Sequence, residues 1–151
     1  MTRNGPLAGK RLHIAGSIGP RTDSSLAAYA HDLVKQVVRG VLERGGGTVV
    51  GAGKEPMLEG GPAQIFDWSV LEVVAEAIQS GVFPEAMGSY RPIVVVVSEK
   101  GETEIPDSRR DLWSELLGSG RVEVKRIMPG ARSATMIREQ QVGYGDALFI
   151  I

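Results

Sequence analysis

The stretch Lys10–Arg21, KRLHIAGSIGPR, predicts the fold: a short apolar strand continues into a glycine-bearing turn, and a long amphipathic helix follows. In such a unit the turn lies at the carboxyl end of a parallel strand, where the next helix presents unpaired N–H groups and the positive end of its dipole. Gly16 and Gly19 let the backbone approach an anionic ligand closely. Ser17 adds a hydroxyl, and Arg21 adds a planar charged donor. The turn is therefore a candidate anion site, although a plain strand-to-helix connection with an exposed arginine fits these residues equally well.

A second strand and a second glycine turn repeat this pattern. Apolar residues recur at helical spacing over Asp23–Arg44, the Gly45–Gly47 run ends that helix, and Thr48–Val50 forms the next strand. The following turn, Gly51–Pro56 (GAGKEP), lacks the phosphate-loop pattern G-x-x-x-x-G-K-[ST], because Glu55 occupies the Ser/Thr position. This excludes a nucleoside triphosphatase of that type. A second wall of the same anion site and a surface loop without a ligand are both compatible with the turn, whose candidate ligand residues are Gly51, Gly53 and Lys54.

The rest of the chain continues the alternation of strands and helices. The expected elements are a helix over Gln64–Ser80, a strand over Pro92–Val97, a helix over Asp107–Leu117, a short strand over Val122–Val124, a helix over Ala134–Val142 and a strand over Ala147–Ile151. The β-branched run PIVVVV at Pro92–Val97 predicts the central strand of a parallel sheet, and ALFII at Ala147–Ile151 predicts another buried strand. Ser98 and Glu99 come just after the expected central strand, where open α/β sheets place ligand groups.

These elements predict an α/β, Rossmann-like fold, with an open, mainly parallel sheet and helices on both faces. We expect one domain over residues 1–151, in which residues 1–9 form a polar lead-in. Because no turn or helix follows the last strand, we also expect a domain that is truncated at its C-terminus. His13 and Trp68 are interpreted as packed structural residues, and Arg109 and Arg110 as solvated surface residues.

Composition limits the classes of function. The chain has 151 residues, of which 42% are hydrophobic and 23% charged, as in an ordinary globular domain. Its net charge of -1 gives no basic field for nucleic acid, which is therefore not an expected partner. With no cysteine and only two histidines, we expect neither a metal nor a cofactor. No segment has the ~20 apolar residues that span a bilayer, so we expect a cytoplasmic protein without a membrane partner.

The order of strands and glycine turns resembles the SLOG superfamily of Rossmann-like nucleotide-binding proteins. The segments that carry the resemblance are KRLHIAGSIG, LERGGGTVVGAG, PIVVVVSEKG and GDALFII, which cover most of the chain. The resemblance implies a ligand site around Gly16, Ser17 and the Gly51–Lys54 turn. Arg132 and Glu139 are weaker correspondences. Members of the superfamily include sensors of nucleotide-derived signals in bacterial antiviral systems and the Lonely Guy enzymes, which cleave nucleoside monophosphates at the N-glycosidic bond.

Three functions are compatible with these patterns. The leading hypothesis is a sensor that binds a nucleotide or an ADP-ribose-type signal in a bacterial antiviral or stress system, as a homo-oligomer with an effector domain or partner protein. The alternative is an N-glycosidase that acts on nucleotides or on a nicotinamide dinucleotide, in which Glu99 or Glu139 stabilises an oxocarbenium-like transition state or activates the attack. A structural domain without a small ligand is the third. If the first two strands are neighbours, Arg21 and the Gly51–Lys54 turn face one crevice and bind one anion there.

Overall fold

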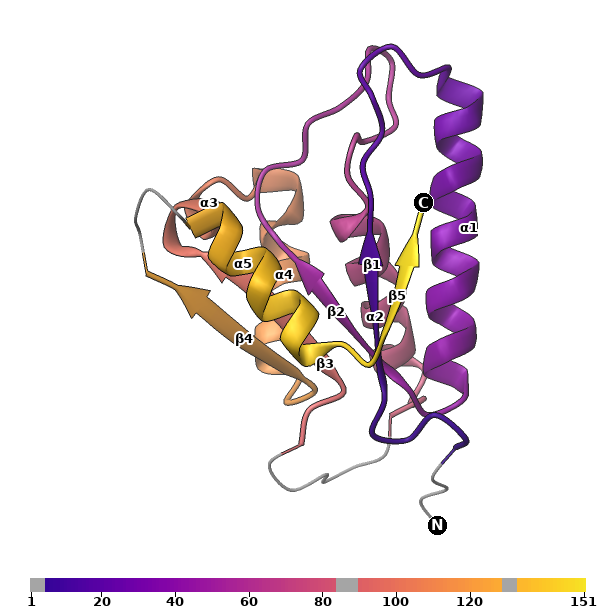
Figure 1. Cartoon of the computed structure of the whole chain (residues 1–151), viewed down its shortest axis with the longest axis vertical. Helices are drawn as coiled ribbons and strands as arrows, with labels where there is room; N and C mark the ends of the chain where they lie inside the picture. Colours follow the sequence, from indigo (N-terminus) through magenta and orange to yellow (C-terminus); the bar gives the residue numbers. More distant parts are fainter. Residues whose placement is uncertain (1–4, 84–89, 129–132) are drawn as a thin grey trace.

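Strands and helices alternate along the chain, except that two helices separate the third strand from the fourth (Figure 1). The computed structural model describes residues 5–83, 90–128 and 133–151. The strands are β1 (Arg11–Ala15), β2 (Gly47–Gly51), β3 (Ile93–Ser98), β4 (Val122–Ile127) and β5 (Ala147–Ile150). The helices are α1 (Ser24–Glu43), α2 (Asp67–Gln79), α3 (Glu99–Thr103), α4 (Asp107–Gly118) and α5 (Ser133–Tyr144). The sequence does not predict α3, because its five residues, EKGET, are too few to show helical periodicity.

The strands form one parallel sheet in the order β4-β3-β2-β1-β5. The middle strand is β2, all of whose residues are buried. The prediction that Pro92–Val97 forms the central strand is therefore wrong by one position, since β3 lies between β2 and β4. β2 and β3 are both interior strands with almost every residue buried, so a continuous run of β-branched residues identifies an interior strand without saying which one is central.

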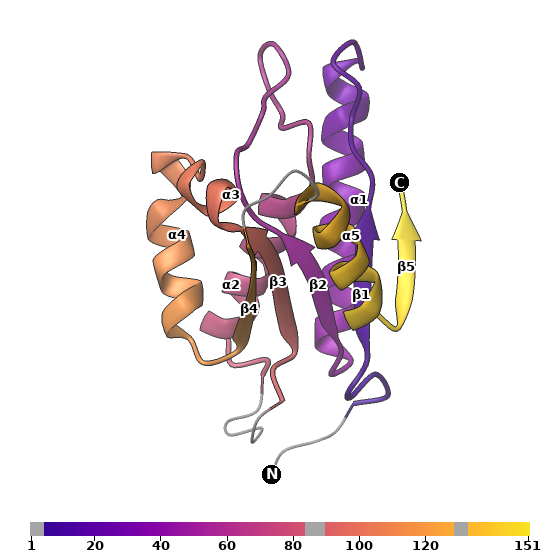
Figure 2. The same cartoon turned by 60° about the vertical axis from the view of Figure 1, so that its left-hand side comes forward.

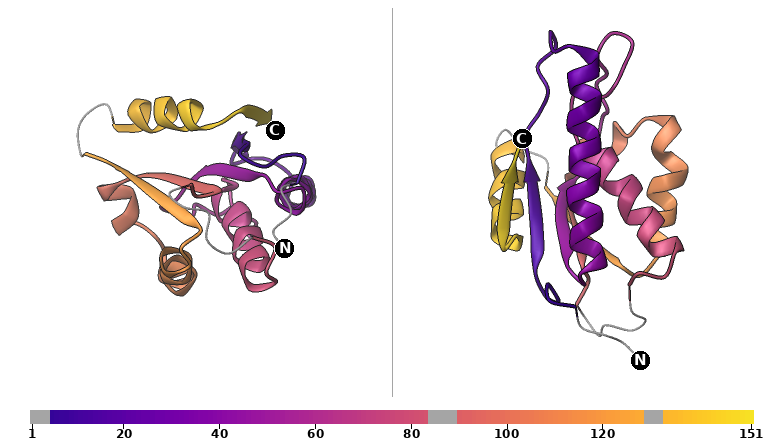
Figure 3. Two further views of the ribbon diagram at one scale, coloured as in Figure 1. Left: turned by 90° about the horizontal axis from the view of Figure 1, so that it is seen from below. Right: turned by 90° about the vertical axis from the view of Figure 1, so that its right-hand side faces the viewer.

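Helices cover both faces of the sheet, which confirms the predicted α/β, Rossmann-like architecture (Figures 2 and 3). α1, α2 and α4 lie on one face, and α5 lies on the other. The larger core, on the first face, includes Val34 and Val38 of α1 and Trp68 of α2. A smaller core under α5 is built around Val49 of β2. Within the residues that the structure describes, no helix is long and apolar enough to cross a membrane.

The last strand differs from the prediction of a buried strand. β5 pairs with β1 and forms one edge of the sheet. Leu148 and Ile150 are 53% and 73% exposed. The physical reason is that α5 packs mainly against β3, nearer the middle of the sheet, and leaves the outward residues of β5 uncovered. An apolar run alone does not distinguish such an edge strand from an interior one.

The direction in which strands are added changes at β1. From β1 the chain adds β2, β3 and β4 in one direction, and α5 then carries it back across the sheet to place β5 on the other side of β1. Open α/β sheets bind ligands at the carboxyl ends of the two strands that flank such a switch. Here these ends meet directly, because the N–H of Ile151 donates to the carbonyl of Ala15 at 3.1 Å.

Candidate functional site

The turn after β1 lies at this switch point. Gly16 has a φ of +146°, and a Cβ there would collide with the backbone carbonyl of Ile151. The glycine is therefore required by the close approach of the two strand ends, whether or not a ligand is present. Ser17 and Gly19 are exposed. Arg21 is exposed too, and it makes no ion pair or hydrogen bond within the described residues, so its guanidinium is available to a ligand.

The amino end of α1 is already occupied by a carboxylate. Asp23 is the N-cap, and its side chain accepts hydrogen bonds from the N–H groups of Ser25 and Leu26. The contact with the Ser25 side chain and these backbone bonds lowers the pKa of Asp23. A negative charge therefore already sits where a phosphate would meet the helix dipole. An anion at this turn would therefore have to contact Ser17 and Arg21 rather than the N–H groups of the helix.

The turn after β2 is buried at its glycines and exposed at its lysine. Gly51 and Gly53 are buried, and the Gly53 carbonyl accepts a 3.0 Å hydrogen bond from Nε1 of Trp68. Trp68 itself is fully buried, as the sequence predicts. Lys54 is exposed and forms no ion pair within the described part of the chain. The turn thus contributes one exposed ammonium group to this edge of the sheet.

The turn after β1 contacts the segment between β2 and α2. β1 and β2 are parallel neighbours, as expected, so their carboxyl ends lie at one edge. Ser17 bridges to Ile65, and the N–H of Ile18 donates to the Gln64 carbonyl at 2.7 Å. These contacts join the first turn to the end of the segment between β2 and α2 rather than to its beginning, where Lys54 lies. The convergence of the arginine and lysine on one anion stays a prediction.

The remaining predicted site residues are dispersed. Ser98 is the N-cap of α3, and its Oγ accepts a 2.9 Å hydrogen bond from the N–H of Gly101. Glu99 is exposed in the first turn of α3, and Glu139 is exposed on α5. These two carboxylates do not interact with each other. Arg132 lies outside the described residues.

A desolvated carboxylate at the same edge is the feature that sequence reasoning misses. Asp67 is the first residue of α2, and its Oδ2 lies 2.9 Å from the point where a Cβ of Gly51 would sit. Nε2 of Gln141, from α5, lies 3.3 Å from the same point, so a carboxylate and an amide converge over this glycine. Burial raises the pKa of Asp67 to about 6, which outweighs the lowering effect of the Gly51 backbone. The only sequence signal is an aspartate at the start of a helix that follows a glycine turn.

His13 lies on the α5 side of the sheet and shares Gln141 with this region. Burial lowers the pKa of His13, and a hydrogen bond with Gln141 opposes the effect. The imidazole is 8% exposed, and its Nδ1 has no partner within the described residues. Those residues contain no group of three or more His, Cys, Asp or Glu side chains that is placed to hold a metal ion. His13 is thus a packed structural residue, as the sequence predicts.

Arg109 is not a solvated residue, which corrects the prediction. It forms two 2.8 Å hydrogen bonds to the carboxylate of Glu55 and one of 2.5 Å to Glu72. Lys35 contacts Glu72 at 2.9 Å. These carboxylates raise the pKa of Arg109 against the effect of burial. Burial opposes ionisation of Glu72, but Lys35 and Arg109 outweigh it and lower the pKa of Glu72. Helical periodicity cannot reveal this network, because its members come from different elements.

Protein-family comparison gives an independent result. Residues 7–151, nearly the whole chain, match the family model described as ATP nucleosidase Cap17-like, N-terminal. The chain belongs to this Cap17-like family. Membership supports a nucleotide-related role and does not distinguish binding from cleavage. Comparisons of the chain with curated proteins and with solved structures give no match.

Proposed function

We propose that this Cap17-like domain binds an adenine nucleotide or an ADP-ribose-type signal at the carboxyl edge of its sheet. The observation that carries the proposal is the coincidence of three features at that edge. These are the strand switch between β1 and β5, two exposed cations in the adjoining turns, and the desolvated carboxylate of Asp67. The family description, which names an ATP nucleosidase, supports an adenine nucleotide as the first ligand to test.

Different residues at this edge suit different parts of a nucleotide. Arg21 and Lys54 suit the phosphates, because both are exposed and neither is neutralised by a neighbouring carboxylate in the described chain. Asp67 and Gln141 suit the uncharged half, since a carboxylate accepts hydrogen bonds from ribose hydroxyls and an amide both donates and accepts. This division predicts that ligands with both a phosphate and a ribose bind more tightly than inorganic phosphate or adenosine.

The domain would act as a sensor in a bacterial antiviral or stress system. In this proposal, nucleotide binding changes the activity of an effector domain or partner protein, and the sensor is a homo-oligomer. The resemblance to SLOG proteins supports this assignment.

Isothermal titration calorimetry with ATP, ADP-ribose and its cyclic forms tests the binding function. We expect heat of binding with at least one of them, and Arg21→Ala should weaken it about ten- to a hundredfold with little change in melting temperature. Lys54→Ala should weaken it less, because lysine is a flexible point charge on a glycine-rich turn. Absence of both heat and thermal shift with all of these ligands would refute the proposal.

One observation favours a second function, N-glycoside hydrolysis. The raised pKa of Asp67, about 6, leaves a fraction of it protonated near neutral pH, as a general acid requires. In this reaction the oxygen of water bonds to C1′ and the bond from C1′ to the base nitrogen breaks, with its electron pair leaving on the base. Asp67 gives its proton to the departing base, and the proton released by the attacking water restores its acid form.

Chromatographic detection of free adenine separates hydrolysis from binding. Hydrolysis predicts adenine release from ATP that is lost in Asp67→Asn and retained in either Glu99→Gln or Glu139→Gln. If adenine release is lost in a glutamate variant but not in Asp67→Asn, the catalytic residue is Glu99 or Glu139, as the sequence suggests, and not Asp67. Tight binding of ATP without any release would leave the sensor function alone.

A further inference from the structure

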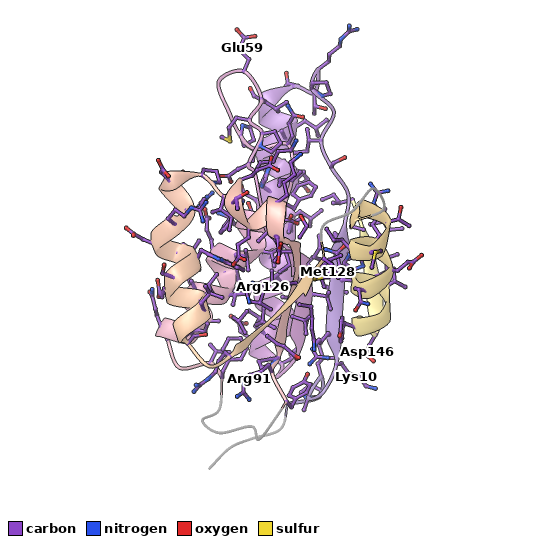
Figure 4. All side chains as sticks on the ribbon, turned by 90° about the vertical axis from the view of Figure 1, so that its left-hand side faces the viewer. Lys10, Glu59, Arg91, Arg126, Met128 and Asp146 are labelled. Carbon is purple, nitrogen blue, oxygen red and sulfur yellow. The ribbon has the colours of Figure 1, made fainter. Side chains whose placement is uncertain are left out.

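The segment Ala52–Phe66, which we call the β2–α2 loop, carries the second glycine turn and ends at Asp67. Figure 4 shows Glu59 at the tip of this loop, beyond the end of the sheet. The loop folds back on itself, because Met57 bridges to Ala63. Within the candidate site, this loop connects the exposed Lys54, near its beginning, to the desolvated carboxylate of Asp67, which follows its end.

Two side chains from different helices fix the beginning of the loop. Trp68, in α2, donates its indole N–H to the Gly53 carbonyl at 3.0 Å. Arg109, in α4, binds both carboxylate oxygens of Glu55 at 2.8 Å. Arg109 also lies 5.7 Å from the centre of the Trp68 ring, so the two contacts support one another. The residues on either side of Lys54 are therefore held in place.

A third helix fixes the end of the loop through His31. Nε2 of this buried histidine, in α1, lies 2.7 Å from the Ala63 carbonyl, and Nδ1 lies 2.6 Å from Oγ of Ser69. Because a carbonyl can only accept, Nε2 must carry a proton, whereas the serine hydroxyl can donate to Nδ1 or accept from it. Both ring nitrogens are satisfied, so the imidazole has one favourable orientation and connects α1, α2 and the loop.

We propose that His31, Trp68 and Arg109 are positioning residues, which hold the β2–α2 loop in its ligand-binding shape without touching the ligand. The proposal rests on the proposed nucleotide site. Ordering a loop costs conformational entropy, and a loop that is already ordered spares the ligand that cost. Each of the three contacts therefore contributes to affinity through the loop.

Two tryptophans provide a matched test. Trp68 and Trp113 are 0% and 3% exposed, and their rings pack edge to face at 6.4 Å. Each donates its indole N–H to one acceptor, but Trp113 donates to Glu102 of α3 at 3.1 Å and not to the loop. Trp68→Phe and Trp113→Phe each keep an aromatic ring in the core and remove one hydrogen bond. Only the first releases the loop.

Hydrogen exchange and calorimetry with ATP and ADP-ribose read out the two variants. We expect faster amide exchange across residues 53–66 in Trp68→Phe but not in Trp113→Phe, and an affinity about two- to tenfold weaker in Trp68→Phe alone. Arg109→Lys, which keeps the charge and loses the paired bonds to Glu55, should give the same pattern and serves if Trp68→Phe does not fold. Equal loop exchange in the two tryptophan variants would overturn the proposal. If the unmodified domain binds neither ligand, the proposed function fails, while the exchange comparison still decides whether these residues hold the loop.

Discussion

Asp67→Asn should make the domain more stable at pH 8 and change its stability little at pH 4. Burial raises the pKa of Asp67 from 3.8 to about 6 in the folded protein. Between these two values the folded state binds a proton that the unfolded state has released. The contribution of Asp67 to stability is therefore fully present below about pH 4 and is lost as the pH rises through 6. Asparagine carries no charge at either pH.

The magnitude follows from the size of the shift. The folded and unfolded values differ by about two pKa units, and each unit corresponds to about 1.36 kcal/mol, which gives about 3 kcal/mol. The free energy of unfolding of Asp67→Asn should therefore exceed that of the unmodified domain by about 3 kcal/mol at pH 8, with the gain appearing between pH 4 and pH 6. Such a gain is large beside the 5–15 kcal/mol that typically stabilises a native domain.

Urea unfolding of both proteins at a series of pH values from 4 to 8 measures this difference. Asp23→Asn is the control, because hydrogen bonds at the N-cap lower the pKa of Asp23, and its charge favours folding at high pH. The control should therefore show no gain at pH 8. Parallel curves for Asp67→Asn and the unmodified domain would mean that the Asp67 carboxylate is solvated and that its proposed role as an acid is wrong.

Other substitutions test packing, ion pairing and anion binding. Gly47→Ala should cost about 4 kcal/mol or more in urea unfolding, because its Cβ would overlap the carbonyl of Pro92, whereas Gly118→Ala meets no atom within 4 Å and should stabilise α4 by about 0.5 kcal/mol. Arg109→Gln should cost about 2–3 kcal/mol in the same assay, since it leaves two partly buried carboxylates without their partner. Nucleotide affinity measured by calorimetry should fall as salt is raised from about 50 to about 300 mM, because salt screens the attraction between the exposed Arg21 and the phosphates. The fall should be smaller in Arg21→Ala, which lacks this charge.

Periodicity was sufficient for most of the fold. The apolar positions of α1 repeat with a helical period, and its expected range, Asp23–Arg44, encloses the observed Ser24–Glu43. The neighbouring parallel arrangement of β1 and β2 follows from a short right-handed connection. These features depend on interactions that are local in sequence or on a general rule of chain topology.

Features that depend on strand order were not predictable in this way. The apolar sequence of β5 predicts a buried strand, but the strand is largely exposed. Its exposure depends on the position of α5, which packs mainly against β3. Likewise, Arg109 is surrounded by polar residues in the sequence, yet Glu55 comes from a loop more than fifty positions earlier. The site residues follow the same division. The glycine turns can be recognised from the local sequence. Asp67 can be recognised as a site residue only in the fold, where α2 and α5 bring it together with Gln141 beside Gly51 of β2.

Arg109 and Asp67, two titratable residues of this region, differ in whether the fold supplies them with a partner of opposite charge. Arg109 is held by two carboxylates that tie α4 to the β2–α2 loop and to α2, so its charge is balanced within the fold. Asp67 has no cationic partner in the described chain, and its burial opposes ionisation. Gly51 leaves the space that the carboxylate occupies, and any side chain there would displace it. Asp67 thus costs stability, stands at the carboxyl edge of an α/β sheet and occupies space left by a glycine, which supports the proposal that it serves the ligand site rather than the stability of the fold.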